Sequence, residues 1–285
     1  MGERAAQGGA QGERHHKGGE RGVRRDAEGD GVMAFFALKN VTKSFGGLVA
    51  VKTVSYEVQP GQIAAMIGPN GAGKSTAFNL VTGLYVPTSG EIEFNGQSIG
   101  GKKPDFVCKL GIARTFQNIR LFAFMTAVEN VMAGRHVRMG AMLWDSLLHT
   151  PKQRAEERHV REKAMELLRF VKLERHADDY AHNLPYGFQR RLEIARALAS
   201  DPTLLLLDEP AAGMNPREKE DLMELIRAIR DRGTTVFLIE HDMGLVMNIS
   251  ERIAVLDHGE KIAEGTPAEI RADSRVIEAY LGKSA

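Results

Sequence analysis

The nine residues Gly68–Thr76 read GPNGAGKST and directly follow the apolar run IAAMI at positions 63–67. A strand that leads into a glycine-rich loop, which in turn opens a helix, is the arrangement of a P-loop. Gly68, Gly71 and Gly73 let the backbone turn sharply, so that successive N–H groups can point at phosphate oxygens. The positive end of the helix dipole adds to the attraction at the same place. The stretch therefore predicts a site for a nucleoside triphosphate.

Two side chains of this loop are suited to phosphate chemistry. The Lys74 ammonium can reach the β- and γ-phosphates, and the Ser75 hydroxyl is placed to ligate Mg²⁺. The alternative is a chance match in a glycine-containing loop, and the apolar run before the loop argues against it.

The composition is that of a globular protein without a strong charge bias. The 285 residues are 43% hydrophobic and 26% charged, and the formal net charge is +1. This length allows one large α/β domain or two small ones. The balanced charge gives no support to a nucleic-acid role. Cys108 is the single cysteine, which rules out an internal disulfide, and no apolar run is long enough to span a membrane.

The first 32 residues differ from the rest of the chain. They contain nine glycines, six Lys or Arg and six Asp or Glu. With almost no large apolar side chains, such a segment cannot offset the entropy cost of ordering, so we expect disorder and no chemistry. A signal peptide would require an apolar segment after its arginines, and this stretch has none. Two alternatives stay open: a native extension, or a true start at Met33.

The pattern over residues 33–285 predicts one domain of the α/β class. Apolar residues at strand spacing, and at the three- and four-residue spacing of helices, define the elements. We expect a P-loop NTPase core with an antiparallel β subdomain and a helical subdomain inserted at about 118–187. The dipeptide Asn95-Gly96 predicts a hairpin. Besides the P-loop strand 63–67 and the helix that starts near Lys74, the predicted strands are 36–41, 51–58, 91–94, 112–116, 204–208, 235–240, 253–256 and 260–263, and the predicted helices are 125–136, 151–173, 189–200, 216–232 and 243–250.

Two carboxylates follow the most apolar of these strands. Residues 204–210 read LLLLDEP. Four consecutive leucines predict a strand buried on both faces, and ligands bind at the carboxyl ends of parallel strands. Asp208 can then hold Mg²⁺ through its water shell, and Glu209 can polarise an attacking water. A solvated loop or a helix cap is the alternative, and the upstream P-loop argues against it.

Two further polar residues stand at the ends of predicted strands. His241 follows TVFLIE at 235–240, a position that would aim its ring at the γ-phosphate. Gln117 ends the strand 112–116 and opens the helical interval. Taken alone, each has an ordinary alternative as a structural or solvated polar residue.

In this order, the motifs resemble the nucleotide-binding subunit of ATP-binding cassette (ABC) transporters. Phe45 in KSFGG matches the aromatic residue that stacks on adenine, and the GPNGAGKST loop matches Walker A. Gln117 matches the Q-loop glutamine, LLLLD the Walker B strand, Glu209 the catalytic glutamate and His241 the switch histidine. The resemblance implies three sets of residues: for nucleotide Phe45, Gly68, Asn70, Gly71, Gly73, Lys74, Ser75, Thr76 and Gly187, for metal Ser75, Gln117 and Asp208, and for catalysis Glu209, His241 and Gln117.

The signature segment departs from the family pattern. The family has an LSGGQ-like sequence that opens a helix facing the γ-phosphate of an ATP held by the opposite subunit, and here residues 184–188 read LPYGF. Pro185 replaces the serine and removes a hydroxyl and an N–H. Gly187 keeps its N–H, and the helix keeps its dipole. Phe188 and Asn215 stand where glutamine and aspartate are commoner. These departures bear on turnover more than on the fold.

Other segments narrow the resemblance. QRRLEIARAL, RTFQNIRLF, DEPAAGMNP, IEHDMGLVM and EGTPAEI are similar to the ATPase subunit of branched-chain amino-acid importers, the LivG type. This implies ATP and Mg²⁺ as cofactors, and a head-to-tail heterodimer with a second ABC ATPase subunit. It also implies separate transmembrane permease subunits, a periplasmic or extracellular solute-binding protein as an indirect partner, and a peripheral place at the cytoplasmic face of the inner membrane.

Two other functions stay open. A non-transport ABC ATPase of DNA repair or translation usually has two cassettes, a long coiled coil or zinc-binding cysteines, whereas this sequence has one P-loop and one cysteine. A nucleotide switch without hydrolysis is disfavoured by Glu209 and His241, while Pro185 and Phe188 keep it open. Because selectivity resides in the permease and the binding protein, related amino acids, amides and aromatic acids remain alternative solutes.

Overall fold

The computed structural model describes residues 35–138 and 151–281, which belong to one structural unit. The predicted extension 1–32 lies outside the described residues. Among the helices that are described, none combines the length and the apolar character that crossing a membrane requires.

The larger sheet carries the P-loop. Its strands are β3 (Ile63–Ile67), β6 (Ile112–Arg114), β7 (Leu204–Asp208), β8 (Thr235–Ile239), β9 (Arg252–Asp257) and β10 (Glu260–Gly265). In the described part of the chain they lie in the order β10-β9-β3-β8-β7-β6. The five strands from β9 to β6 run parallel, and only β10 pairs antiparallel. The carboxyl ends of β3, β8 and β7, where the predicted site residues follow, therefore lie side by side.

Both faces of this sheet are buried, which explains its continuous apolar runs. Leu205 and Leu207 of β7 pack into the core on one face, and Leu204 and Leu206 pack into the core on the other. Residues of β3 and β8 alternate between the same two cores. The prediction that the LLLL run is buried on both faces is confirmed.

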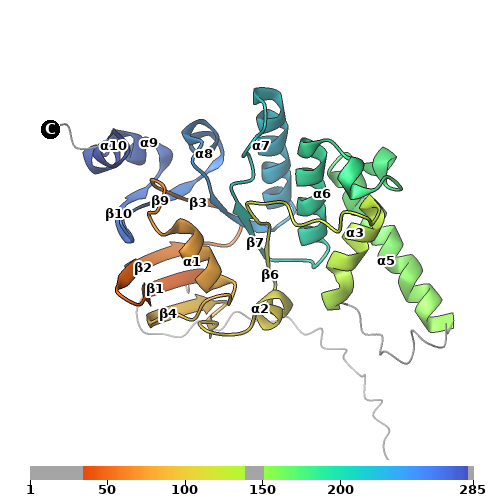
Figure 1. The fold of residues 1–285 in the computed structure, drawn as a ribbon, viewed down its shortest axis with the longest axis horizontal. Helices are drawn as coiled ribbons and strands as arrows, with labels where there is room; N and C mark the ends of the chain where they lie inside the picture. Colours follow the sequence, from red (N-terminus) through yellow and green to blue (C-terminus); the bar gives the residue numbers. More distant parts are fainter. Residues whose placement is uncertain (1–34, 139–150, 282–285) are drawn as a thin grey trace, which may run out of the picture. The chain divides into compact units, whose positions relative to one another are not determined.

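A smaller antiparallel sheet covers one face of the larger one. Its strands are β1 (Phe36–Phe45), β2 (Leu48–Val58), β4 (Ser89–Phe94) and β5 (Gln97–Ser98). Helix α1 (Lys74–Val81) shares the core between the two sheets. Phe94 pairs with Gln97 across the Asn95-Gly96 turn, so the predicted hairpin is confirmed. Parallel and antiparallel sheets together confirm the α/β class (Figure 1).

Helices pack on the other face of the larger sheet (Figure 1). The remaining helices are α2 (Pro104–Leu110), α3 (Ala127–Gly134), α5 (Pro151–Phe170), α6 (Tyr186–Leu198), α7 (Pro216–Asp231), α8 (Met243–Ile249), α9 (Pro267–Ala272) and α10 (Ser274–Leu281). Apolar residues of α3, α5, α6 and α7 join the same core. Short 3₁₀ turns at 135–138, 174–176 and 181–183 complete the interval between β6 and α6.

Several predicted boundaries are wrong by one to four residues. Helix α6 begins at Tyr186 and not at residue 189, because Pro185 takes the N-cap position instead of breaking the segment. Strand β6 ends at Arg114, since the chain turns away toward the helical interval. The short helices α2, α9 and α10 were not predicted, because few apolar residues in each reach the core.

Candidate functional site

The P-loop is shaped by what surrounds its glycines. Gly68, Gly71 and Gly73 have φ angles of 148°, 82° and 99°. A Cβ atom added to Gly68 would lie 2.1 Å from the carbonyl oxygen of Leu256, and one added to Gly73 would lie 2.3 Å from that of Ala50. At Gly71 it would meet nothing within 4 Å. Gly68 and Gly73 are thus required because another backbone segment lies too close for a side chain. Gly71 is required only for its backbone conformation.

Lys74 opens α1, and its side chain folds back over the loop. Its Nζ donates to the carbonyl oxygens of Gly68 at 2.7 Å and Pro69 at 2.9 Å. Burial lowers the pKa of Lys74, and the charges of Glu209 and Asp208 oppose that shift. An anion in the loop would offer this buried ammonium a charged acceptor in exchange for two neutral ones.

Asp208 ends β7 and is held by an arginine that the motif analysis did not single out. The Nη2 atom of Arg114 donates to Asp208 Oδ2 at 2.6 Å, and both side chains are buried. Among the described residues, Asp208 Oδ1 is buried without a hydrogen-bond partner. Mg²⁺ prefers carboxylate and hydroxyl oxygens together with waters, so this oxygen and the exposed Ser75 hydroxyl fit that ion.

Arg114 is fixed by polar contacts on its other side. Its Nη1 atom donates to Asn79 Oδ1 at 2.7 Å and to Thr82 Oγ1 at 3.2 Å, both on or next to α1. Its guanidinium lies 5.1 Å from the ring centroid of Phe116. The signal in the sequence was a lone arginine at the end of a short apolar strand, three residues before Gln117.

The three residues predicted to be catalytic lie together. Gln117 Nε2 donates to Glu209 Oε2 at 2.8 Å, and His241 Nδ1 lies 3.6 Å from the same oxygen. They follow β6, β7 and β8, which are neighbours in the sheet. Glu209 has a φ of 46°, a left-handed conformation that costs a non-glycine residue free energy. Its N–H bonds the Ile239 carbonyl oxygen at 2.9 Å, which helps to hold this conformation.

Glu240 is a buried carboxylate next to this cluster, and the sequence analysis took it only as the end of a strand. Its oxygens accept hydrogen bonds from the backbone N–H groups of Ala211 at 2.8 Å, His241 at 3.1 Å and Asp242 at 3.3 Å. Burial raises the pKa of Glu240, although the three N–H donors act to lower it. Glu240 thereby joins the segment after Glu209 to the segment that carries His241.

The signature segment begins α6. Pro185 is its N-cap, and no side chain in the described part of the chain caps this end. Gly187 lies in the first turn, and a Cβ atom there would stand 2.7 Å from Glu218 Oε1. The ring of Phe188 packs 5.2 Å from that of His176, partly buried against the core. Phe188 is therefore held by packing in the position where the family commonly has glutamine.

Asn215 has a structural role that explains its presence. It is the N-cap of α7, and its Oδ1 accepts from the Glu218 N–H at 3.0 Å. Glu218 Oε2 in turn accepts from the Asn215 N–H at 2.9 Å, which completes a capping box. Asparagine and aspartate serve about equally well at this position.

The remaining predicted nucleotide contacts are spread around the loop. Phe45 lies at the end of β1 with its ring partly exposed, 5.1 Å from the ring of Tyr85 and 4.9 Å from Lys43 Nζ. Strand β2, which follows in the same hairpin, passes the P-loop at Ala50. Asn70 is exposed at the tip of the loop, and Thr76 is partly buried in the first turn of α1.

Comparison with known proteins identifies the family. A model of the ABC transporter family matches residues 51–212, and a model described as branched-chain amino acid ATP-binding cassette transporter matches residues 260–285. The chain belongs to the ABC transporter ATPases. It is thus an ATP hydrolase, and the nucleotide of its P-loop is ATP.

Curated relatives of this ABC ATPase align over most of its length. The high-affinity branched-chain amino acid transport ATP-binding protein LivG of Escherichia coli (strain K12) is 47% identical over 241 residues, which are 84% of this chain and 94% of the relative. The corresponding protein BraF of Pseudomonas aeruginosa is 47% identical over 248 residues, covering 87% and 97%.

Solved ABC structures share the fold. A nucleotide-free cassette of an ABC transporter superposes with a TM-score of 0.77 at 33% identity, covering 88% of this chain and 100% of that one. A dimeric cassette bound to ADP and Pi in a post-hydrolysis state superposes with a TM-score of 0.69 at 30% identity, covering 81% and 98%. The predicted P-loop NTPase core is confirmed by these neighbours.

Proposed function

We propose that this ABC ATPase powers the uptake of branched-chain amino acids, or of closely related solutes, through a separate permease. Its curated relatives LivG and BraF are named for high-affinity branched-chain amino acid transport, and the chain spans nearly their whole length. The match of residues 260–285 to a branched-chain amino acid transporter family supports the same substrate class.

One observation above all supports a hydrolytic site here: the side chains of Gln117 and His241 both approach the same carboxylate oxygen of Glu209. In this proposal Glu209 orients a water molecule and accepts its proton as the water attacks the γ-phosphorus of ATP. The bond between that phosphorus and the bridging oxygen breaks, and ADP leaves. His241 donates to the γ-phosphate, and Gln117 holds Glu209 in place.

The other site residues bind the nucleotide. Phe45 stacks on adenine, and the phosphates are held by the P-loop residues Gly68, Asn70, Gly71, Gly73, Lys74, Ser75 and Thr76. When Mg²⁺ is bound, it neutralises charge on the β- and γ-phosphates. Ser75, Asp208 and Gln117 would hold this ion, while Arg114 fixes the other oxygen of Asp208.

A second subunit completes the site. We assign residues 33–285 to the nucleotide-binding domain and about 118–187 to its helical subdomain, of which 139–150 lie outside the described residues. Gly187, at the N-terminus of α6, would contact the γ-phosphate of an ATP held by the partner. Dimers of related cassettes support this arrangement. The partner would be a related but different ABC subunit, which makes a heterodimer.

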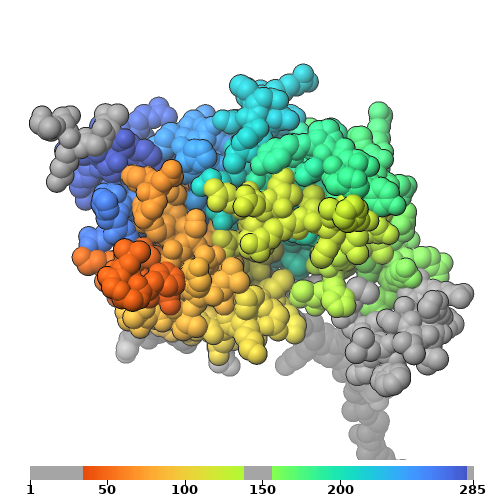
Figure 2. All heavy atoms as spheres, viewed as in Figure 1, coloured from red at the N-terminus to blue at the C-terminus, as the bar shows by residue number. Residues whose placement is uncertain are grey.

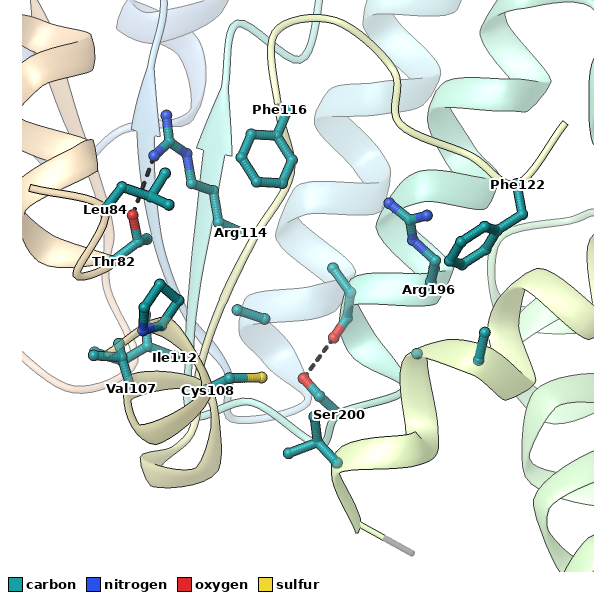
Figure 3. Close-up of a pocket in the computed structure, with 16 residues that line it drawn as sticks. Thr82, Leu84, Val107, Cys108, Ile112, Arg114, Phe116, Phe122, Arg196 and Ser200 are labelled. Carbon is teal, nitrogen blue, oxygen red and sulfur yellow. Dashed lines mark hydrogen bonds between the residues drawn. The ribbon is translucent and has the colours of Figure 1, made fainter. Parts of the chain in front are cut away.

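The permease would dock on a cleft beside the Gln117 segment. A cavity of about 370 Å³ lies among α2, α3 and α6 (Figure 3). Val107, Phe116, Phe122 and Arg196 line it, so it combines apolar walls with a guanidinium group. A permease loop seated there would touch the segment that carries Gln117. The chain would then lie at the cytoplasmic face of the membrane, and a solute-binding protein outside would act only through the permease.

Two measurements test this function. Glu209→Gln is expected to lower kcat for ATP hydrolysis by about 10²- to 10⁴-fold, the usual worth of a general base. The control Glu91→Gln, an exposed carboxylate of the smaller sheet, is expected to keep full activity. Equal turnover by Glu209→Gln and the parent protein would contradict hydrolysis at this site.

The substrate class is tested in the complex. The co-purified complex, reconstituted in proteoliposomes, is expected to take up leucine, isoleucine or valine at the expense of ATP. Uptake that responds only to chemically unrelated solutes would contradict the proposed substrate class while leaving the ATPase intact.

A further inference from the structure

A fully buried ion pair on the signature helix α6 lies apart from the proposed catalytic cluster. Arg190 Nη1 and Glu193 Oε2 are 2.8 Å apart, and their side chains are 0% and 1% exposed. Burying two charges costs free energy that their attraction alone seldom recovers, so such a pair is weak evidence for stability. Its hydrogen bonds show what it organises.

Those bonds go to the backbone on both sides of Gln117. Arg190 Nη1 donates to the carbonyl oxygen of Phe116 at 2.7 Å, and Nη2 donates to that of Gln117 at 2.8 Å. Glu193 Oε1 accepts from the N–H groups of Phe116 at 3.4 Å and Arg120 at 3.3 Å. The pair therefore holds both carbonyls that flank the Gln117 α-carbon.

This segment has little other regular support. The Thr115 N–H still donates to the Leu206 carbonyl oxygen of β7 at 3.0 Å, but Gln117 and Asn118 beyond it are exposed. In Figure 2 the yellow-green atoms of the connection that follows lie at the surface, between the orange P-loop segment and the green helical segment. Side-chain hydrogen bonds from α6 take the place of a strand ladder here.

The same helix carries the end that would face the second ATP. Gly187 precedes Arg190 by three residues, about one turn of α6. A rotation or shift of α6 would move the Arg190 guanidinium and the backbone of Gln117 with it. The 2.8 Å contact between Gln117 and Glu209 would then change with the position of the signature end.

We propose that Arg190 and Glu193 are positioning residues, which set the place of Gln117 against Glu209 according to the place of the signature helix. The proposal rests on the ATPase site described above. The signature end and the Gln117 segment would then move together. When Gly187 binds the partner's ATP, the position of Gln117 in the same subunit would change as well.

The test is a double-mutant cycle on kcat in the intact, co-purified complex. Arg190→Lys keeps the charge but loses the fork that reaches both carbonyls. It is expected to lower kcat by about tenfold to a hundredfold, because a catalytic group misplaced by about 1 Å costs up to that much. The Kd for ATP is expected to stay within twofold, since the P-loop is untouched. In a Gln117→Ala background, Arg190→Lys is expected to cause no further loss.

Arg191→Lys is the matched control. Arg191 is the next residue of the same helix, but its Nη2 pairs with Asp221 on α7 at 2.6 Å and not with the Gln117 segment. The kcat of the Arg191→Lys variant is expected to stay within twofold of that of the parent protein. If Arg190→Lys fails to fold in a thermal melt, Glu193→Gln replaces it in the same cycle, because it keeps the size and an acceptor oxygen.

Two results would overturn the proposal: losses that multiply in the double variant, or a loss of kcat matched by an equal loss in Arg191→Lys. Glu209→Gln, measured in the same series, distinguishes failure of the positioning role from failure of the proposed ATPase function. If Glu209→Gln is inactive and the cycle is multiplicative, only the positioning role fails. If Glu209→Gln keeps full activity, the ATPase assignment itself fails.

Discussion

The two ends of the proposed ATP site are built in different ways. At the P-loop end, the backbone of β2 and of β9 closes on the glycines, so that added Cβ atoms at Gly73 and Gly68 would lie 2.3 Å and 2.1 Å from carbonyl oxygens. At the signature end, the atoms nearest to a Cβ on Gly187 belong to the Glu218 side chain, with Oε1 at 2.7 Å. One end is rigid backbone, and the other is a helix terminus lined by a movable side chain.

This difference follows from what each end must do. The N–H groups of the P-loop have to be in place before the phosphates arrive, because ordering a flexible loop would reduce the free energy of ATP binding. The signature end would instead approach an ATP held by another subunit. Pro185 and Tyr186 are exposed there, whereas Gly187 is buried beside Glu218, so this end has to be able to move. The Arg190–Glu193 pair ties this movable end to the backbone of Gln117, whose side chain contacts Glu209.

The largest predicted effect is at the rigid end. Gly73→Ala forces a methyl group against the Ala50 carbonyl at a φ of 99°, so overpacking and backbone strain add. We expect a loss of about 2–6 kcal/mol in the free energy of unfolding, and loss of ATP binding. Gly187→Ala is expected to change that free energy by about 1 kcal/mol or less, since Glu218 can turn aside at the cost of its capping bond to the Asn215 N–H, while alanine favours the helix. Urea unfolding measures both.

Gly71→Ala is the matched control within the loop. Gly71 also has a positive φ, 82°, but no atom lies within 4 Å of the added carbon, so this substitution is expected to cost only about 1–2 kcal/mol of conformational strain. Equal losses for Gly73→Ala and Gly187→Ala would show that the two ends do not differ in rigidity.

What the sequence predicted well is what depends on local order. The run LLLLDEP specifies a two-faced strand and places two carboxylates at its end, because burial and alternation act over neighbouring residues. The meeting of Gln117, Glu209 and His241 followed from parallel strands whose carboxyl ends share an edge.

Contacts between distant segments were not predictable in the same way. Arg114 and Asp208 are 94 residues apart, and Arg190 reaches back 73 residues to Gln117. No spacing rule relates such partners, because the fold alone decides which backbone groups a buried arginine can satisfy. The departures at Pro185 and Phe188 were visible, but only the packing of Phe188 on His176 shows how one of them is accommodated.

The next effect concerns Glu240, which joins the segment after Glu209 to the segment that carries His241. Glu240→Gln replaces an acceptor of three N–H bonds by an amide that brings its own donors, so we expect a loss of about 1–3 kcal/mol and lower kcat through His241. Because burial raises its pKa above the ordinary 4.5, the unfolded chain ionises first as pH rises. The parent protein should therefore lose stability relative to the variant above pH 4.5, until the folded carboxyl has ionised too.

Urea unfolding of both proteins across this pH range measures that difference. The advantage of the parent over Glu240→Gln is expected to be greatest at the acid end and to level off once Glu240 is charged in both states. An advantage that grows with pH would contradict the raised pKa and the buried environment behind it.

A smaller effect is expected at the movable end. Pro185→Ser restores a capping hydroxyl worth about 1 kcal/mol, but it also frees the unfolded chain by about 0.4–1 kcal/mol, so stability should change little. In the assembled complex the hydroxyl and N–H add donors toward the partner's ATP, and kcat is expected to rise up to about tenfold. A rise in stability without any change in kcat would contradict this prediction, because it would show that the new hydroxyl caps the helix but does not reach the γ-phosphate of the partner's ATP.

The smallest effect is expected at Asn215, which also departs from the commoner residue of the family. Asn215→Asp keeps the capping acceptor for the Glu218 N–H, while a favourable charge at the helix start is offset by the nearby Glu218 carboxylate. We expect changes below about 0.5 kcal/mol in unfolding and below twofold in kcat, whereas the control Asn215→Ala should lose about 1 kcal/mol. A many-fold gain by Asn215→Asp would mean that this position acts on the nucleotide, and the movable end would then extend beyond α6 to the start of α7.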